Sequence, residues 1–592
     1  MNLDLILRTE IQKTASTVFD QSVESFQIQP TNKEFEGSYT LVCFPLTKIS
    51  KKSPEETARL MGEHLVAHSG IVSKFNVVKG FLNLVISDKT WLEAFRSING
   101  DKNIGTLPSN GKEIMVEYSS PNTNKPLHLG HLRNSFLGWS VAEIYKAIGY
   151  KVHKVQIIND RGIHICKSMA AWKLFGQGET PQSSGLKGDK LVGNYYVEFD
   201  RVFKSQSKEL EARGVSAETA GKEAPIMKLA VEMLQQWEQR KPDVMQLWKM
   251  MNGWVYEGFD GTYKRMGVDF EKLYYESETY LLGKEEVIRG VEQGVFFQKE
   301  DGSVWVDLTA DGLDQKVLMR SDGTSVYMTQ DVGTAILRFR DFPKIEKQVY
   351  TVGNEQEYHF NVLFLILAKL GYAWAKECYH LSYGMVDLPS GKMKSREGTV
   401  VDADDLMQEM VDEAAKQTRE LGKIDEMTSQ EVESLSEIVG MGALKFFLLK
   451  VDPKKRMLFD PGESIQLQGH TGPFIQYTHA RICSIIRKAK TLGIMPDPEL
   501  AESLEPVERD LIFLVNSYRS KLEEAAREYS PSIIANLAFE LAKQYNQFYQ
   551  SIPIFNEGDQ GKLKFRIALS EVVGYVLKRA MGLLGIQVPE RM

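Results

Sequence analysis

The sequence predicts an α/β protein. A parallel-sheet domain occupies the middle of the chain, a small α+β module precedes it, and an all-helical module follows it. In the middle, a strand pattern over 113–120, a helical pattern over 128–150 and a second strand pattern over 151–159 follow one another. Strand–helix–strand order of this kind is typical of a parallel sheet. Strand patterns end near residue 456, and only helical patterns follow.

The first module is predicted to span residues 1–110. A helical pattern near 2–25 precedes the apolar runs YTLVCFPL and FNVVKGFLNLVI, and a second helical pattern, SPEETARLMGEHLVAH, lies between these runs. Short alternating runs of this kind indicate strands. The polar stretch NGDKNIGTLPSNGK is expected to link this module to the next one.

The middle domain is predicted to span residues 111–455. Its first strand, helix and second strand are followed by long helical patterns over about 165–265, which we interpret as a helical insertion. Further strands are expected at SVWVDL, KQVYTVG and YHLSYGMVDL, with the helix EYHFNVLFLILAKLGY between the last two.

The last module, residues 456–592, is predicted to be an all-α bundle. Its helical segments are TGPFIQYTHARICSIIRKAK, ERDLIFLVNSYRSKLEEAAREY, SIIANLAFELAKQYNQFYQSI and KFRIALSEVVGYVLKRAMGLLG. The first of them carries basic residues, which on their own most often form only a solvated helix face.

Composition narrows the class of protein. The sequence contains no run of about 18 apolar residues, so it predicts no membrane span. The N-terminus does not resemble a signal peptide. The four cysteines lie far apart, which argues against a disulfide framework or a cysteine zinc site and favours the cytoplasm. The net charge of −7 neither supports nor excludes nucleic-acid binding. No P-loop, HExxH or GxSxG motif is present.

The stretch EYSSPNTNKPLHLGHLRN, residues 117–134, carries the clearest chemical pattern. It joins the first predicted strand to the next helix, where open parallel sheets bind ligands and a helix N-terminus attracts phosphate. His128 and His131 lie on one face of the first helical turn, Gly130 lets a flat group approach the backbone, and Lys125 stands upstream. Two such histidines alone would more often be structural, and they could also bind metal; no neighbouring cysteine or second carboxylate completes a metal set, so we expect no metal site.

SSPNTNKPLHLGHLRN resembles the HIGH-type signature of class I aminoacyl-tRNA synthetases, in the form found in arginyl-tRNA synthetases. GKMKSREGTVV resembles the second class I signature, KMSKS. The resemblance extends from about residue 110 to the C-terminus through SDGTSVYMTQDVG, GNEQEYHF, GHTGPFIQYTHARI and LGIQVPERM. It implies a Rossmann-type catalytic domain and an ATP- and Mg²⁺-dependent arginine–tRNA ligase. Such an enzyme forms arginyl-adenylate and then transfers the arginyl group to tRNA(Arg), and the family characteristically needs tRNA for the first step.

The resemblance also implies roles for residues at the phosphates. His128 and His131 would donate hydrogen bonds to the phosphates, and Gly130 would lie under the adenine. The second signature falls on Lys392, Met393, Lys394, Ser395 and Arg396, so its usual second lysine is replaced by Ser395. Lys125 would then supply the missing cation, as in many arginyl enzymes; a one-residue slip that lets Lys394 serve is the alternative.

The amino-acid pocket and the tRNA contacts are implied in the same way. A guanidinium needs carboxylates and other acceptors around it. Asp331 would accept the guanidinium, one helical turn from Tyr327, and Asn122, Glu276 and Gln356 would line the pocket. Tyr477, Arg481 and Met592 would contact tRNA, although tyrosine and methionine at helical spacing are often core residues. The first module would read the tRNA elbow, and the family is usually monomeric.

Three other classes of protein remain open at this point. One is a class I synthetase for another amino acid, such as a glutamyl, cysteinyl or methionyl enzyme. The second is a small-molecule adenylyltransferase, which shares the HxGH site but needs neither flanking module. The third is an RNA-binding protein on a degenerate synthetase scaffold, which would not need both phosphate signatures.

Overall fold

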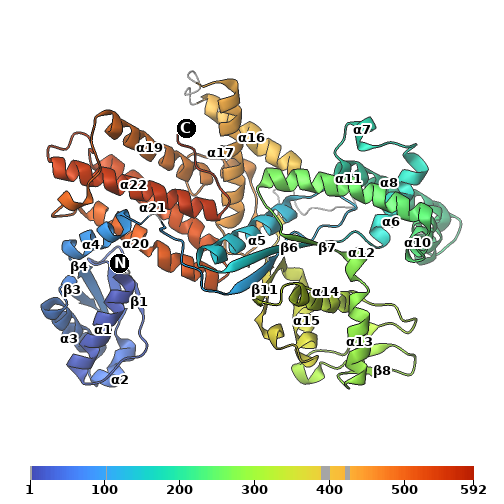
Figure 1. Cartoon of the computed structure of the whole chain (residues 1–592), viewed down its shortest axis with the longest axis horizontal. Helices are drawn as coiled ribbons and strands as arrows, with labels where there is room; N and C mark the ends of the chain where they lie inside the picture. The colour runs from blue at the N-terminus through green and yellow to red at the C-terminus, as the bar shows by residue number, and fades with distance from the viewer. Residues whose placement is uncertain (1–2, 102, 388–400, 421–426) are drawn as a thin grey trace.

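The structure is a computed structural model that describes residues 3–101, 103–387, 401–420 and 427–592. Figure 1 shows the first module at one end, the C-terminal helices beside it, and the central sheet leading to the helical insertion at the opposite end. None of the helices within these described ranges is long and apolar enough to cross a membrane.

The first module is an antiparallel sheet covered by helices. Its four strands have the order β1-β2-β4-β3. Helix α3 begins where the side chain of Ser53 accepts a hydrogen bond from the backbone N–H of Glu56, and Pro54 occupies the first turn. The elements are α1 (Leu3–Phe19), β1 (Ile28–Pro30), β2 (Tyr39–Val42), α2 (Thr47–Ser50), α3 (Pro54–His68), β3 (Val72–Val78), β4 (Phe81–Ile86) and α4 (Asp88–Asn99).

The central sheet confirms the predicted parallel α/β fold. Its five strands have the order β12-β11-β5-β6-β7, and all neighbours are parallel. The strands are β5 (Glu113–Glu117), β6 (Lys151–Ile158), β7 (Lys272–Tyr275), β11 (Ile345–Gly353) and β12 (Cys378–Tyr383), and the helices next to them are α5 (Leu129–Ala147), α12 (Glu276–Thr279), α13 (Leu282–Glu292), α14 (Tyr327–Asp341) and α15 (Glu357–Lys369). The chain passes from β5 to β6 on one side and later returns with β11 on the other. The crevice beyond the carboxyl ends of β5 and β11 is therefore the switch point at which such sheets bind ligands.

The expected helical insertion lies between β6 and β7. Its helices are α6 (Ile163–Phe175), α7 (Pro181–Ser184), α8 (Gly188–Ala212), α9 (Ala217–Glu223), α10 (Pro225–Glu238) and α11 (Pro242–Met266). Helices α8 and α11 pack closely because Gly258 of α11 has no side chain. A Cβ at residue 258 would overlap the buried carboxylate of Asp189 on α8.

Three expectations about strands need correction. SVWVDL forms β9 (Val304–Val306), but it belongs to a separate antiparallel sheet with β8 (Phe296–Gln298) and β10 (Lys316–Met319). YHLSYGMVDL is divided between β12 and β13 (Val386–Asp387), because the chain breaks the ladder at residues 384–385. β14 (Met457–Leu458) lies just beyond residue 456, where no further strand was expected, and pairs in parallel with β13.

Helices α16 (Ala403–Glu420) and α17 (Ser429–Leu449) follow the central sheet within the part assigned to the middle domain. The part after residue 456 is helical beyond β14, as predicted. Its helices are α18 (Pro461–Ser464), α19 (Gly472–Thr491), α20 (Pro506–Arg527), α21 (Ser532–Ser551) and α22 (Gln560–Leu583). The first module packs against this bundle through α4 and α20, where Arg509 Nε lies 2.6 Å from Asp88 Oδ1. The domain limits at residues 110 and 455 stay predictions.

Candidate active site

The turn after β5 is held in an unusual backbone conformation. Ser119 has φ = 59°, a left-handed value that is uncommon for a residue with a side chain. Its N–H donates to Asn134 Oδ1 at 2.6 Å, and its carbonyl accepts from Gln156 Nε2 at 2.8 Å. Asn134 Nδ2 in turn donates to the carbonyl oxygen of Thr351 on β11 at 2.7 Å. Contacts to α5, β6 and β11 thus direct the next residues into the switch-point crevice.

His128 and His131 form a reciprocal cap at the start of α5. The Nδ1 atom of His128 accepts from the backbone N–H of Gly130, and the Nδ1 atom of His131 accepts from the backbone N–H of His128, each at 3.1 Å. The two ring centroids are 3.9 Å apart. An Nδ1 atom that accepts a backbone N–H carries no proton, so each neutral ring bears its proton on Nε2.

Both imidazoles are neutral near pH 7. Burial lowers the pKa of His128 to about 3, and the charge of Lys125 adds to this effect. Burial likewise lowers the pKa of His131 well below its usual range, with His128 and Lys125 contributing. The start of α5 therefore presents neutral N–H donors beside a lysine, which suits phosphate oxygens better than a metal ion.

Lys125 lies in the connection just before these histidines. Burial lowers the pKa of its amino group. Together with Lys190, Asn194 and Asp402 it lines a cavity of about 240 Å³ between this connection and helix α8. The structure thus brings Lys125, His128 and His131 together, as the motif predicts.

The second signature lies outside the described residues. Lys392, Met393, Lys394, Ser395 and Arg396 all belong to the interval 388–400, so the choice between Lys125 and Lys394 stays a prediction.

The segment that follows the second signature is described, and it lies against the first signature. The N–H of Leu129 donates to the carbonyl oxygen of Val401 at 3.3 Å, and the N–H of Ala403 donates to that of Leu127 at 2.9 Å. His128 and Asp402 are thereby paired in an antiparallel bridge. The first signature and the segment that follows the second one, separated by more than 250 residues in the sequence, are therefore paired at this bridge.

Carboxylates gather at the other end of the crevice. Burial raises the pKa of Glu276 to about 7; Arg161 opposes the rise, while Asp160 and Asp331 add to it. Asp331 keeps 41% of its side chain exposed and contacts His359 Nε2 through Oδ2 at 2.6 Å. Acidic groups that raise the pKa of a neighbour in this way indicate a place for a cation.

The remaining predicted pocket residues border the same crevice. Tyr327 begins α14 and is 75% exposed, and Asp331 follows one turn later on the same face. Asn122 follows β5 and bridges to Asn159 after β6, and Gln356 precedes α15 after β11. These positions all belong to the carboxyl ends of the strands or to helices that begin there.

Two buried carboxylates that the motif comparison did not single out position this pocket. Asp160 accepts hydrogen bonds from the N–H and Oγ of Ser277, at 2.9 and 2.7 Å, and so fixes the residue next to Glu276. Glu117, at the end of β5, forms a buried ion pair with Arg338 of α14, the helix that carries Asp331. Burial raises the pKa of both carboxyl groups. The hydrogen bonds from Ser277 to Asp160 and the charge of Arg338 beside Glu117 oppose this rise. Glu117 ends β5, and Asp160 lies two residues after the end of β6. An acidic residue at the carboxyl end of a buried strand is the sequence signal that could have identified both.

The predicted tRNA contacts lie on or near α19. The guanidinium of Arg481 lies over the ring of Tyr477 at 5.0 Å and over the ring of Tyr549, which is 44% exposed, at 4.9 Å. Met592 packs partly buried against the hydrophobic core. Tyr549 was not predicted from the sequence. It lies on α21, and its contact with Arg481 of α19 depends on how the two helices pack.

Among the residues that the structure describes, no group of three or more His, Cys, Asp or Glu side chains could hold a metal ion. The four cysteines are free thiols.

Three protein families match successive parts of the chain. The family described as "Arginyl tRNA synthetase N terminal domain" matches residues 5–86, "tRNA synthetases class I (R), catalytic domain" matches residues 97–460, and "DALR anticodon binding domain" matches residues 475–592.

The chain is also similar over its whole length to individual proteins. It is 55% identical over 597 residues to Arginine--tRNA ligase of Amoebophilus asiaticus, with 100% of each chain covered. It is 56% identical over 570 residues to Arginine--tRNA ligase of Bacteroides thetaiotaomicron, with 96% of this chain and 95% of that one covered. Among solved structures, Thermus thermophilus arginyl-tRNA synthetase has the same fold, with a TM-score of 0.78 at 24% identity over 100% of both chains.

Proposed function

The chain belongs to the arginyl-tRNA synthetase family of class I aminoacyl-tRNA synthetases, and from this premise we propose how its residues carry out arginine–tRNA ligation. Arginine's carboxylate attacks the α-phosphate of ATP, which gives arginyl-adenylate and releases pyrophosphate. The 3′-terminal adenosine of tRNA(Arg) then accepts the arginyl group, and AMP leaves.

Catalysis of the first step is assigned to the start of α5. The Nε2–H donors of His128 and His131 contact the phosphate oxygens, and Gly130 lets the adenine approach the backbone. A Cβ at Gly130 would lie only 3.0 Å from Cε1 of His128, so a larger residue would also displace that ring. Lys125 supplies the positive charge that the second signature lacks. No protein atom becomes covalently attached, so these groups act by positioning and by stabilising charge on phosphate oxygens.

Magnesium is assigned to the nucleotide rather than to the protein. Mg²⁺ commonly binds through substrate phosphates and one or two carboxylates, and it keeps several waters. Asp402, which is bridged to His128, and Asp405 are both paired with Lys190. We therefore treat Mg·ATP as the substrate and assign no resident metal ion.

Arginine recognition rests on Asp331 and Glu276, and the observation that carries the assignment is the raised pKa of the buried Glu276 carboxyl beside the negative charges of Asp160 and Asp331. Without a bound cation, Glu276 has a pKa of about 7 and is only partly ionised near neutral pH, because burial opposes its charge and Asp160 and Asp331 add to this effect. A guanidinium favours the ionised form of Glu276 and offers paired N–H donors to both carboxylates. The arginine pocket is further lined by Tyr327, Asn122 and Gln356.

Transfer RNA is assigned to the two flanking modules. The stacked group of Tyr477, Arg481 and Tyr549 offers aromatic faces and a cation, which suits unstacked bases. Met592 lies near the end of the same bundle, and residues 1–110 would contact the tRNA elbow. We further propose that the enzyme is a cytoplasmic monomer, with limits between its three parts near residues 110 and 455.

Aminoacylation of total tRNA with labelled arginine tests this function. The full-length enzyme should charge tRNA with arginine and not with lysine, which has no planar fork of donors. His128→Ala and His131→Ala should each reduce the rate while the KM for arginine stays near the wild-type value. Charging with lysine at a comparable rate would contradict the pocket assignment.

A further inference from the structure

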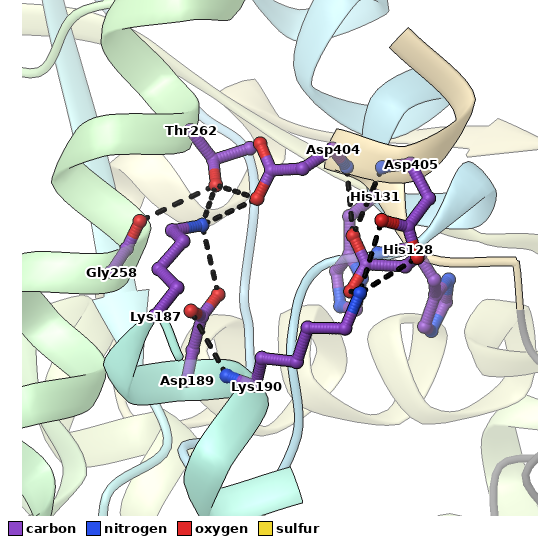
Figure 2. Close-up of polar contacts among 10 residues, drawn as sticks. His128, His131, Lys187, Asp189, Lys190, Gly258, Thr262, Asp404 and Asp405 are labelled. Atoms are coloured by element: carbon purple, nitrogen blue, oxygen red, sulfur yellow. Dashed lines mark hydrogen bonds and ion pairs between the residues drawn. The ribbon is translucent and has the colours of Figure 1, made fainter. Parts of the chain in front are cut away.

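The helical insertion is joined to the first turn of α16 by Lys187, the residue that precedes α8. Lys187 Nζ lies 2.5 Å from Asp404 Oδ2 and 3.1 Å from Asp189 Oδ2 (Figure 2). Thr262 of α11 donates to the same Asp404 oxygen at 3.0 Å. One ammonium group therefore serves two carboxylates that come from different parts of the chain.

A second lysine makes a parallel connection one helical turn further along. Lys190 Nζ lies 2.8 Å from Asp405 Oδ2 (Figure 2). It also lies 3.9 Å from Asp402 Oδ2. Asp402 Oδ1 also caps α16 by accepting the backbone N–H of Asp404 at 2.8 Å. Both lysines therefore hold the same helical turn.

This turn adjoins the phosphate end of the active site. Asp402 is the residue bridged to His128, and the backbone hydrogen bonds of residues 401 and 403 run on either side of that bridge. A displacement of α16 relative to α8 would act directly on the segment that lies against His128.

Helix α8 also contacts the connection that carries Lys125. A Cβ at Gly193 would lie 2.7 Å from Cδ of Pro126, so the helix approaches this connection as closely as a glycine permits. Lys190 and Asp405 line the same 240 Å³ cavity as Lys125. The insertion thus touches both Lys125–Pro126 and the segment paired with His128.

We propose that Lys187 and Lys190 are positioning residues for amino-acid activation: they hold residues 401–403 and the Lys125 connection in register with His128. This inference rests on the proposed function, because it assigns both lysines to the ATP half of that site. Neither lysine contacts a residue of the arginine pocket among the contacts described, so they should affect ATP use and leave arginine binding unchanged.

The two lysines differ in burial, and so should their effects. Asp189 is 1% exposed, and Lys187 and Asp404 are each 31% exposed, so removal of the Lys187 amino group leaves two sheltered carboxylates close together. Lys190 and Asp405 are 40% and 65% exposed, and water compensates for much of their attraction. We expect the rate of activation to fall about tenfold or more in Lys187→Met and about two- to fivefold in Lys190→Met.

The test is arginine-dependent ATP–pyrophosphate exchange by full-length enzyme in the presence of tRNA. Lys264→Met is the matched control, since Lys264 lies on α11 and pairs only within that helix, with Asp260 at 2.6 Å in the described structure. The proposal predicts a lower kcat and a changed KM for ATP in both test variants, a KM for arginine within about twofold of wild type, and a control like wild type. An unchanged kcat in Lys187→Met, or equal increases in both KM values, would overturn it.

A second variant separates positioning from stability. Lys187→Met combined with Asp404→Asn removes one of the two carboxylates left without a cation but does not restore the connection. The melting temperature should recover toward wild type while kcat stays low; recovery of kcat together with the melting temperature would show a merely structural role. If wild-type enzyme itself showed no arginine-dependent exchange, the proposed function would fail rather than this inference.

Discussion

Arginine affinity should depend on pH through Glu276. Burial raises the pKa of this carboxyl to about 7; Arg161 opposes the rise, and Asp160 and Asp331 add to it. A bound guanidinium favours the ionised carboxylate, so the pKa in the complex lies below that of the free enzyme. Arginine binding therefore releases a proton when the pH is below the free-enzyme pKa, and affinity falls as the pH drops through it.

The size of the effect follows from the ionised fraction. With a pKa of about 7, that fraction falls from about nine-tenths at about pH 8 to about one-tenth at about pH 6. The guanidinium and the carboxylate of arginine keep their charges throughout this range. The dissociation constant should therefore rise about tenfold between these two pH values, which corresponds to about 1.4 kcal/mol.

Isothermal titration calorimetry of arginine at both pH values measures this change, and paired buffers of different ionisation enthalpy report the released proton. Glu276→Gln should bind arginine more weakly and lose the pH dependence that Glu276 causes. Glu278→Gln is the matched control, because Glu278 is an exposed residue of the same short helix. Equal pH slopes in wild type and Glu276→Gln, or affinity that improves as the pH falls, would show that Glu276 does not control the pH dependence of arginine binding.

Three further changes test other parts of the site. Asp331→Asn removes a charge-assisted contact and should weaken arginine binding by about 2–5 kcal/mol, seen as a higher KM for arginine; an unchanged KM would remove Asp331 from the pocket. Lys125→Ala should lower the kcat of pyrophosphate exchange strongly and Lys394→Ala only mildly, and the reverse order would assign the missing signature lysine to Lys394. Deletion of residues 1–110 should impair tRNA charging more than arginyl-adenylate formation, and wild-type charging kinetics in the truncated enzyme would contradict a tRNA role for the first module.

The features that the sequence predicts correctly are mostly local. The stretch EYSSPNTNKPLHLGHLRN runs from the end of β5 into the first turns of α5, so His128 and His131 lie at the start of that helix. The strand pattern and the helical pattern can both be recognised from neighbouring residues in the sequence. Tyr327 and Asp331 share a face for the same reason, since they are one turn apart on α14.

The features that were missed depend on contacts between distant segments. The partners Asp331–His359, Asp160–Ser277 and Lys187–Asp404 join different elements, and no periodicity encodes which element lies beside which. SVWVDL shows the same limit: its apolar alternation predicts a strand, but its pairing with β8 and β10 is set by the chain path after α13. Hydrophobic alternation specifies a buried face and leaves the partner strand open.

ATP–pyrophosphate exchange with each of the common amino acids, with and without total tRNA, tests most directly which amino acid this enzyme activates. We expect exchange with arginine alone, dependent on tRNA and reduced when Asp331 is changed to asparagine. Exchange with another amino acid instead of arginine, or none with arginine when tRNA is present, would show that Glu276 and Asp331 do not form an arginine pocket.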